Sequence, residues 1–124
     1  MKNFSYKNIL VVEDEDVNFI FINLILTNNH FNVLRACTGT EAVMYVKNNT
    51  NIDLILMDIE LPELNGWGAI LQIKKIDEKL PIIVQTAFNL KEYEKRCFEM
   101  GCQAFLAKPY NANDLLALIK KYLK

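Results

Sequence analysis

The sequence predicts an α/β fold in which parallel strands alternate with helices along one domain, residues 1–124. Two observations carry this prediction. Short apolar runs alternate along the chain with segments whose apolar residues recur every three or four positions. Three of the five runs are almost uninterrupted, as burial on both faces of a parallel sheet requires. Strict alternation of strand and helix places helices on both faces, so we expect a doubly wound (βα)5 sheet.

The strands are the apolar runs that polar, glycine or proline residues bound on either side. In chain order they are predicted at residues 8–14, 31–36, 53–58, 81–86 and 104–107. The helices are the segments with the apolar spacing of one buried stripe. They are predicted at residues 17–28, 40–48, 66–78, 90–100 and 113–123.

Strand order follows from connection rules. Right-handed crossovers leave few arrangements of five parallel strands. We choose the order 2-1-3-4-5, which is flavodoxin-like, because it sets strands 1 and 3 side by side at the switch point where open α/β sheets bind ligands. Asp14 and Asp58 would meet there.

Composition narrows the function classes. The chain has 14 basic and 15 acidic residues without a basic stripe, so direct nucleic-acid binding is not expected. No stretch approaches the roughly 18 apolar residues of a membrane span, and the polar start lacks a signal peptide, so a cytoplasmic location is expected. Three cysteines without metal-ligand spacing are typical of buried thiols in a reducing compartment.

Charged residues follow the apolar runs. If the strands are parallel, Glu13, Asp14, Asp58 and Lys108 arrive at one edge of the sheet. Three gathered carboxylates repel each other unless a cation joins them, and Mg²⁺ prefers oxygen ligands. Consecutive residues on a regular strand point to opposite faces, so Glu13 and Asp14 can share one ion only where the strand ends.

Asp58 ends the most hydrophobic run, at the base of a loop. A carboxylate there can attack phosphorus and form an aspartyl phosphate, while Lys108 pairs first with the carboxylate and then with a phosphoryl oxygen. The hydroxyl of Thr86 would reach the same edge, and Pro109 permits a cis bond after Lys108. Taken singly, such residues also serve as caps or β-formers, and only their joint placement indicates a site.

In the combination of these residues, the chain resembles a response-regulator receiver domain over residues 6–124. The resemblance implies a set of site residues, each matched by position. Glu13, Asp14, Asp58 and the backbone carbonyl of Glu60 would hold Mg²⁺, Asp58 would be the phosphoacceptor, Lys108 the conserved-type lysine, and Thr86 and Phe105 the switch pair. Glu60 and Phe88 match positions that tune the lifetime of the phosphoryl group in that family.

The resemblance also implies an activity. Asp58 would take a phosphoryl group from the phosphohistidine of a histidine kinase or histidine phosphotransfer protein, and slow hydrolysis would follow. The protein would then be a signalling switch rather than an enzyme, with Thr86 and Phe105 repacking one face. A free-standing receiver and a piece of a longer regulator or hybrid kinase fit equally.

Two helices carry more apolar residues than one buried stripe needs. In the first, Val17, Ile20 and Leu24 form a second stripe, which would either dock on the donor's helical bundle or lie beneath the fifth helix. The last helix offers a surface for a homodimer or an output contact. Its apolar residues are Leu115, Leu116, Leu118, Ile119, Tyr122 and Leu123.

Three rival functions remain open. A phosphatase of the haloacid-dehalogenase type would use Asp14 and Asp16, but Asn18 departs from its pattern and no cap domain fits this length. A flavodoxin-type electron carrier needs hydroxyl and glycine residues after the first strand to hold phosphate, where this chain is acidic. The third rival is a binding module of the same fold that works without phosphorylation.

Overall fold

The computed structural model describes residues 5–48 and 51–123, so the ends of the predicted domain lie outside the described residues. The strands are β1 (Asn8–Val12), β2 (Asn32–Ala36), β3 (Leu54–Asp58), β4 (Ile82–Thr86) and β5 (Ala104–Ala107). The helices are α1 (Asp16–Asn28), α2 (Gly39–Lys47), α3 (Gly66–Ile76), α4 (Lys91–Glu99) and α5 (Ala112–Tyr122). Within the described residues, no helix has both the length and the apolar character needed to cross a membrane.

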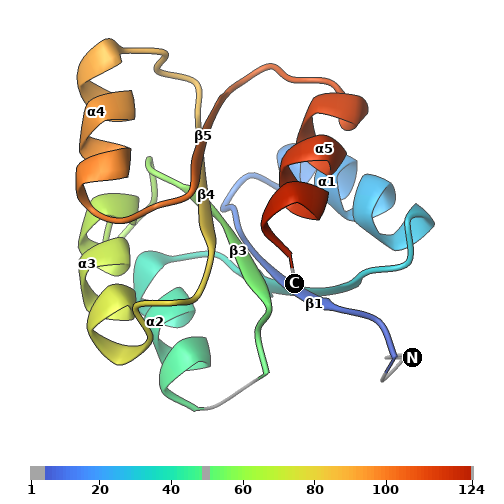
Figure 1. Cartoon of the computed structure of the whole chain (residues 1–124), viewed down its shortest axis with the longest axis horizontal. Helices are drawn as coiled ribbons and strands as arrows, with labels where there is room; N and C mark the ends of the chain where they lie inside the picture. The colour runs from blue at the N-terminus through green and yellow to red at the C-terminus, as the bar shows by residue number, and fades with distance from the viewer. Residues whose placement is uncertain (1–4, 49–50, 124) are drawn as a thin grey trace.

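The strands form one parallel sheet in the order β2-β1-β3-β4-β5. Helices α1 and α5 cover one face, and α2, α3 and α4 cover the other (Figure 1). The predicted doubly wound sheet and its strand order are therefore confirmed.

The core has two halves because alternate strand residues point to opposite faces. On β1, Leu10 and Val12 pack toward α2, α3 and α4, whereas Ile9 and Val11 pack toward α1 and α5. All four side chains are fully buried. Burying one such side chain contributes about 1.5–3 kcal/mol, so the uninterrupted apolar runs seen in the sequence are what hold the two helix layers to the sheet.

The first strand is shorter than predicted. It ends at Val12, and the backbone N–H of Glu13 donates a last hydrogen bond of 3.0 Å to the carbonyl of Ala36 before the chain turns. The prediction of a strand through Asp14 was wrong by two residues, because the sequence pattern marks the last apolar residue but not the point where pairing stops.

Helix starts differ in how they are capped. The side chains of Thr38, Asn65 and Asn111 accept backbone N–H groups at the first turns of α2, α3 and α5. At α1 the N-cap residue is Glu15, whose side chain makes no cap hydrogen bond. The loop between β1 and α1 must therefore be held by other contacts.

Helix α4 ends in a Schellman motif. Gly101 has a φ of +90°, and the N–H groups of Gly101 and Cys102 donate to the carbonyls of Phe98 and Cys97. The motif places Cys97 and Cys102 in the core, as predicted for buried thiols, whereas Cys37 is half-buried.

Candidate functional site

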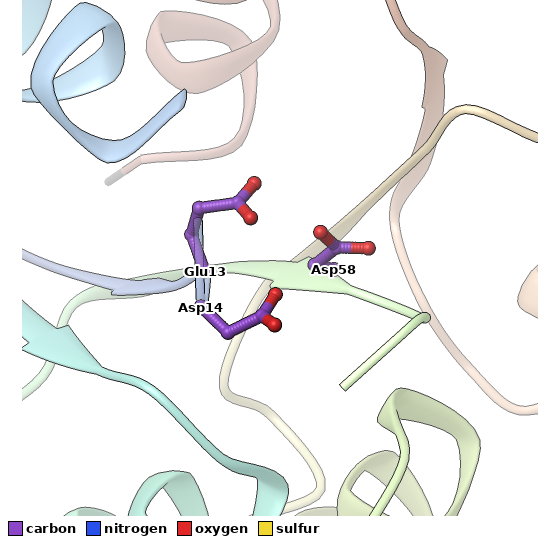
Figure 2. Close-up of side chains that lie close together, drawn as sticks. All are labelled: Glu13, Asp14 and Asp58. Carbon is purple, nitrogen blue, oxygen red and sulfur yellow. The ribbon is translucent and has the colours of Figure 1, made fainter. Parts of the chain in front are cut away.

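Three carboxylates gather where β1 and β3 end. Glu13 and Asp14 follow β1, and Asp58 is the last residue of the neighbouring β3. One oxygen of each lies within 4.8 Å of the others, and Figure 2 shows the side chains of Glu13 and Asp14 extending toward Asp58. Asp14 is exposed, but Glu13 is 0% and Asp58 only 3% exposed. The early end of β1 allows two consecutive carboxylates to reach one point.

Lys108 joins two of these carboxylates. Its Nζ donates to Glu13 Oε1 at 2.7 Å and to Asp58 Oδ2 at 2.8 Å. The residue follows β5, its backbone N–H donates to the carbonyl of Thr86 at 2.8 Å, and the Lys108–Pro109 peptide is cis. Side chains 95 and 50 positions apart in sequence are thus brought into direct contact.

The charges perturb each other. Burial, together with the nearby charge of Asp58, raises the pKa of Glu13 although Lys108 opposes the shift. Burial would lower the pKa of Lys108, but its hydrogen bonds to Asp58 and Glu13 outweigh burial and raise it. The ammonium therefore stays charged, and three carboxylates against one ammonium leave the site with excess negative charge.

Thr86 makes a contact that sequence reasoning missed. Its Oγ1 donates to the Glu60 carboxylate, at 2.9 Å from Oε1 and 3.1 Å from Oε2, and accepts the N–H of Phe88 at 3.0 Å. Partial burial raises the pKa of Glu60. The sequence placed Glu60 two positions after Asp58 but carried no signal that its side chain would take the hydroxyl of a different strand.

The backbone after Asp58 also contributes. The N–H of Glu60 donates to Asp58 Oδ1 at 3.1 Å, while Lys108 holds Oδ2. Gly66 packs so closely that a Cβ there would overlap the carbonyl oxygen of Asp58. The two oxygens of the Asp58 carboxylate are therefore held by different donors, the N–H of Glu60 and the ammonium of Lys108.

A cavity of about 680 Å³ opens beside Asp58 and Lys108. Aromatic and proline side chains from three parts of the chain line it. They are Phe21 of α1, Phe88 after β4, and Pro109 and Tyr110 after β5. The cavity is large enough for a small molecule or a partner's side chain to reach the carboxylate.

Tyr110, which lines the cavity, also forms a hydrogen bond with Gln85 of β4. Its hydroxyl donates to Oε1 of the fully buried Gln85 at 2.6 Å, and burial raises the pKa of Tyr110. No described residue accepts from Nε2 of Gln85. The contact ties the segment after Lys108 to β4.

Phe105 lies apart from the carboxylates. It is a half-buried residue of β5, opposite Val84 in the register of the sheet, and packs on the α4 side of the core. The structure therefore brings Glu13, Asp14, Asp58 and Lys108 together, puts Thr86 beside them through Glu60, and leaves Phe105 on the neighbouring face.

The donor set suits a hard divalent cation. Carboxylate oxygens are the ligands that Mg²⁺ and Ca²⁺ prefer, and these three come from neighbouring strand ends at short spacing. The cluster could bind a metal ion.

Comparison with known proteins gives consistent results. The model of the response regulator receiver domain matches residues 9–120. The polar-differentiation response regulator DivK of Brucella anthropi is 34% identical over 119 residues, which cover 94% of this chain and 96% of that protein.

Solved structures are similar over nearly the whole chain. The receiver domain of a sensor histidine kinase from Pseudomonas aeruginosa, with a magnesium ion coordinated in its active site cleft, is 31% identical with a TM-score of 0.87, covering 94% of this chain and 97% of that one. A chain of the CheX-CheY-BeF3-Mg²⁺ complex from Borrelia burgdorferi is 28% identical with a TM-score of 0.89, covering 95% and 90%.

Proposed function

The chain belongs to the response regulator receiver family, and from that premise we propose that Asp58 accepts a phosphoryl group from a phosphohistidine, in a site that also holds Mg²⁺. The donor is a histidine kinase or a histidine phosphotransfer protein of a two-component system. One observation carries the proposal: the buried carboxylate of Asp58, at a strand end, contacts the ammonium of Lys108 in the lining of the cavity and lies close to two further carboxylates.

The chemistry follows from the contacts of Asp58. One of its oxygens attacks phosphorus, the bond from phosphorus to the donor imidazole nitrogen breaks, and the electron pair leaves with the imidazole. Lys108 holds Asp58 Oδ2 before transfer and is placed to pair with a phosphoryl oxygen afterward. The walls of the cavity would exclude bulk water around the donor ring.

The metal would be held by Glu13, Asp14, Asp58 and the backbone carbonyl of Glu60. Bound Mg²⁺ would neutralise charge on the phosphoryl group in transfer. The carboxylate cluster and the magnesium ion in the similar Pseudomonas receiver support this assignment. Because Lys108 now occupies one oxygen each of Glu13 and Asp58, the ion and the ammonium would share these carboxylates.

The switch pair would respond to the new charge. The Thr86 hydroxyl would leave Glu60 for a phosphoryl oxygen, and Phe105 would turn into the space that Thr86 vacates. Both residues border the face formed by α4 and β5, so repacking there would signal to an output partner. In this role the protein is a signalling switch of the cytoplasm and not a classical enzyme.

Helix α1 supplies a surface for the donor. Val17 is 79% exposed, and Ile20 and Leu24 are each 56% exposed, so this stripe does not lie beneath α5. The stripe is on the same helix as Phe21, which lines the cavity. We assign it to docking of the donor's helical bundle.

The last helix gives less support to a homodimer. Leu115 and Ile119 are buried, and the other four apolar residues of the predicted surface are half-buried against the core. Dimerisation through this helix stays a prediction. The phosphatase rival is also weakened, because Asp16 points away to form an ion pair with Arg35 and is 82% exposed.

The test is phosphorylation with acetyl phosphate and Mg²⁺, followed on a phosphate-affinity gel. The wild type and the control Asp114→Asn, which changes an exposed carboxylate of α5, should gain phosphate that is labile to acid, base and hydroxylamine. Asp58→Asn should gain none. Uptake by Asp58→Asn would show that the acceptor is wrong, and lack of uptake by the wild type would favour the phosphorylation-independent binding module.

Docking is tested separately. Ile20→Glu should slow transfer from a phosphorylated donor protein while leaving uptake from acetyl phosphate and the melting temperature unchanged, because Ile20 is exposed. An equal loss with both donors would contradict the docking assignment.

A further inference from the structure

Arg35 of β2 contacts the loop that carries two of the three clustered carboxylates. Its Nε donates to the backbone carbonyl of Glu13 at 3.2 Å, and its Nη2 donates to the carbonyl of Asp14 at 3.4 Å. The same Nη2 donates to Asp16 Oδ1 at 2.9 Å, and the guanidinium lies 4.5 Å from the ring centre of Phe19. One side chain therefore joins β2, the loop and the first turn of α1.

These contacts act on one peptide unit from both ends. The carbonyl of Asp14 accepts from Arg35, and the N–H of the same peptide, on Glu15, donates to Glu13 Oε2 at 3.2 Å. The other oxygen of Glu13 accepts from Lys108. A chain of hydrogen bonds thus runs from the guanidinium, through a peptide group, to the carboxylate at the centre of the site.

The loop has few other restraints. The side chain of Glu15 does not cap α1, and Asp14 is exposed. The N–H of Glu13, bonded to the carbonyl of Ala36, holds the start of the loop, and Glu15 accepts hydrogen bonds from Phe19 and Asn18 at its end. None of these contacts acts on the peptide between residues 14 and 15. Rotation of that peptide would turn its N–H away from Glu13 Oε2, so the guanidinium helps to orient a carboxylate whose other oxygen is held by Lys108.

We propose that Arg35 is a positioning residue of the metal site, which fixes the peptide between residues 14 and 15 and so sets the carboxylates of Glu13 and Asp14 for a divalent cation. This inference rests on the proposed function, since it assumes that the carboxylate cluster takes Mg²⁺. Replacing a residue that orients metal ligands by hydrogen bonding typically changes metal affinity by about 10- to 100-fold.

The direction in which Mg²⁺ affinity changes when Arg35 is removed distinguishes a positioning role from a purely electrostatic one. If Arg35 acted only as a positive charge near the site, its removal would strengthen the binding of Mg²⁺. If it acts by geometry, its removal weakens binding, and a lysine does not restore it, because an ammonium lacks the planar fork that reaches two carbonyls and a carboxylate at once.

The experiment measures Mg²⁺ affinity by calorimetry for the full chain and for Arg35→Ala, Arg35→Lys and Arg96→Ala. The last variant is the control: it removes the same charge from α4, where the Arg96 guanidinium stacks on Trp67. Both Arg35 variants should bind Mg²⁺ about 10-fold more weakly than the wild type, with Arg96→Ala unchanged. Equal or tighter binding by Arg35→Ala would overturn the inference.

A second readout needs no metal. Amide hydrogen exchange at Glu15, followed by NMR, should quicken in both Arg35 variants and not in Arg96→Ala, because only the former lose the restraint on that peptide. Unchanged exchange would overturn the inference even if metal affinity fell. If the wild type itself binds no Mg²⁺, the proposed metal site fails, whereas weakened restraint in the Arg35 variants would still establish the contact.

Discussion

Replacing Lys108 by methionine tests the electrostatic balance of the site. The substitution keeps an unbranched chain of similar length but removes both hydrogen bonds, at 2.7 Å to Glu13 and 2.8 Å to Asp58. Glu13 would then be a fully buried carboxylate whose remaining partner is the N–H of Glu15. We expect the variant to be less stable than the wild type in metal-free buffer.

The magnitude follows from burial. The Lys108 side chain is 16% exposed and its partners 0% and 4%, so solvent screens the pair weakly. Removing one partner of a buried ion pair typically costs about 3–5 kcal/mol. A domain of this size unfolds with a free energy of about 5–15 kcal/mol, so the variant should still fold. If the unfolding free energy falls by about 2 kcal/mol per molar urea, the urea concentration at the midpoint of unfolding should fall by about 2 M.

The assay is urea unfolding followed by circular dichroism, with Lys95→Met, a change at an exposed lysine of α4, as control. Adding Mg²⁺ should reduce the difference in stability between Lys108→Met and the wild type, because the variant frees the carboxylate oxygens that Lys108 occupies and so binds the ion more tightly in its folded state. A loss below about 1 kcal/mol, or no larger than that of the control, would refute the reasoning.

Lowering the pH should reduce the difference in unfolding free energy between Lys108→Met and the wild type. The pKa of Glu13 is raised above its ordinary value of 4.5 in the folded state, and loss of Lys108 removes an interaction that lowers it. The folded state then binds a proton more tightly than the unfolded state, so stability rises as pH falls through the raised pKa toward 4.5. If acidification instead increased the difference in unfolding free energy between the variant and the wild type, this prediction would be contradicted.

Three further predictions concern neighbouring contacts. Glu60→Gln should speed uptake from acetyl phosphate by up to about tenfold, because the Thr86 hydroxyl exchanges a charge-assisted hydrogen bond for a neutral one that is about 1 kcal/mol weaker; an unchanged rate on a phosphate-affinity gel would contradict this. Gly66→Ala should cost about 1–3 kcal/mol in urea unfolding, since its Cβ overlaps the backbone after β3, and full stability would show that the backbone can yield. Tyr110→Phe leaves Oε1 of buried Gln85 without its donor and should lower Tm by about 4–10 °C in a thermal melt, whereas an equal Tm would indicate that water replaces the hydroxyl.

Much of the fold was predictable because the residues that form the apolar pattern of the sequence are the ones buried between the sheet and the helices. The alternation of apolar runs with helical spacing predicted each strand and helix that the described residues form, and connection rules selected the observed strand order. The end of β1 was missed, since the last apolar residue and the last paired residue need not coincide. That difference matters for the site, because it frees Glu13 and Asp14 to face one point.

The gathering of Glu13, Asp14, Asp58 and Lys108 at one edge of the sheet could be predicted from residue type and position, but the hydrogen-bond partners of the neighbouring side chains could not. Nothing local to Thr86 indicates that its hydroxyl is bound to Glu60, since Thr86 ends β4 whereas Glu60 lies in the loop after β3, and the contact depends on the geometry of that loop. The contacts of Arg35 were missed for the same reason: an arginine within a strand is ordinarily a solvated side chain, and two of its acceptors are carbonyls 21 and 22 positions away.

The amino-acid sequence by itself determined the order of elements, the sheet topology and the set of carboxylates at the strand ends, because periodicity and the parallel arrangement are properties of apolar spacing. Only the tertiary structure decided which oxygen meets which donor, that the α1 stripe stays exposed, and that Lys108 rests between two carboxylates. The hydrogen bonds and ion pairs depend on differences of a few tenths of an ångström in the distances between side chains that are remote in sequence, a scale to which apolar burial is not sensitive. The exposure of the α1 stripe depends on where α5 packs, which apolar spacing within α1 does not specify.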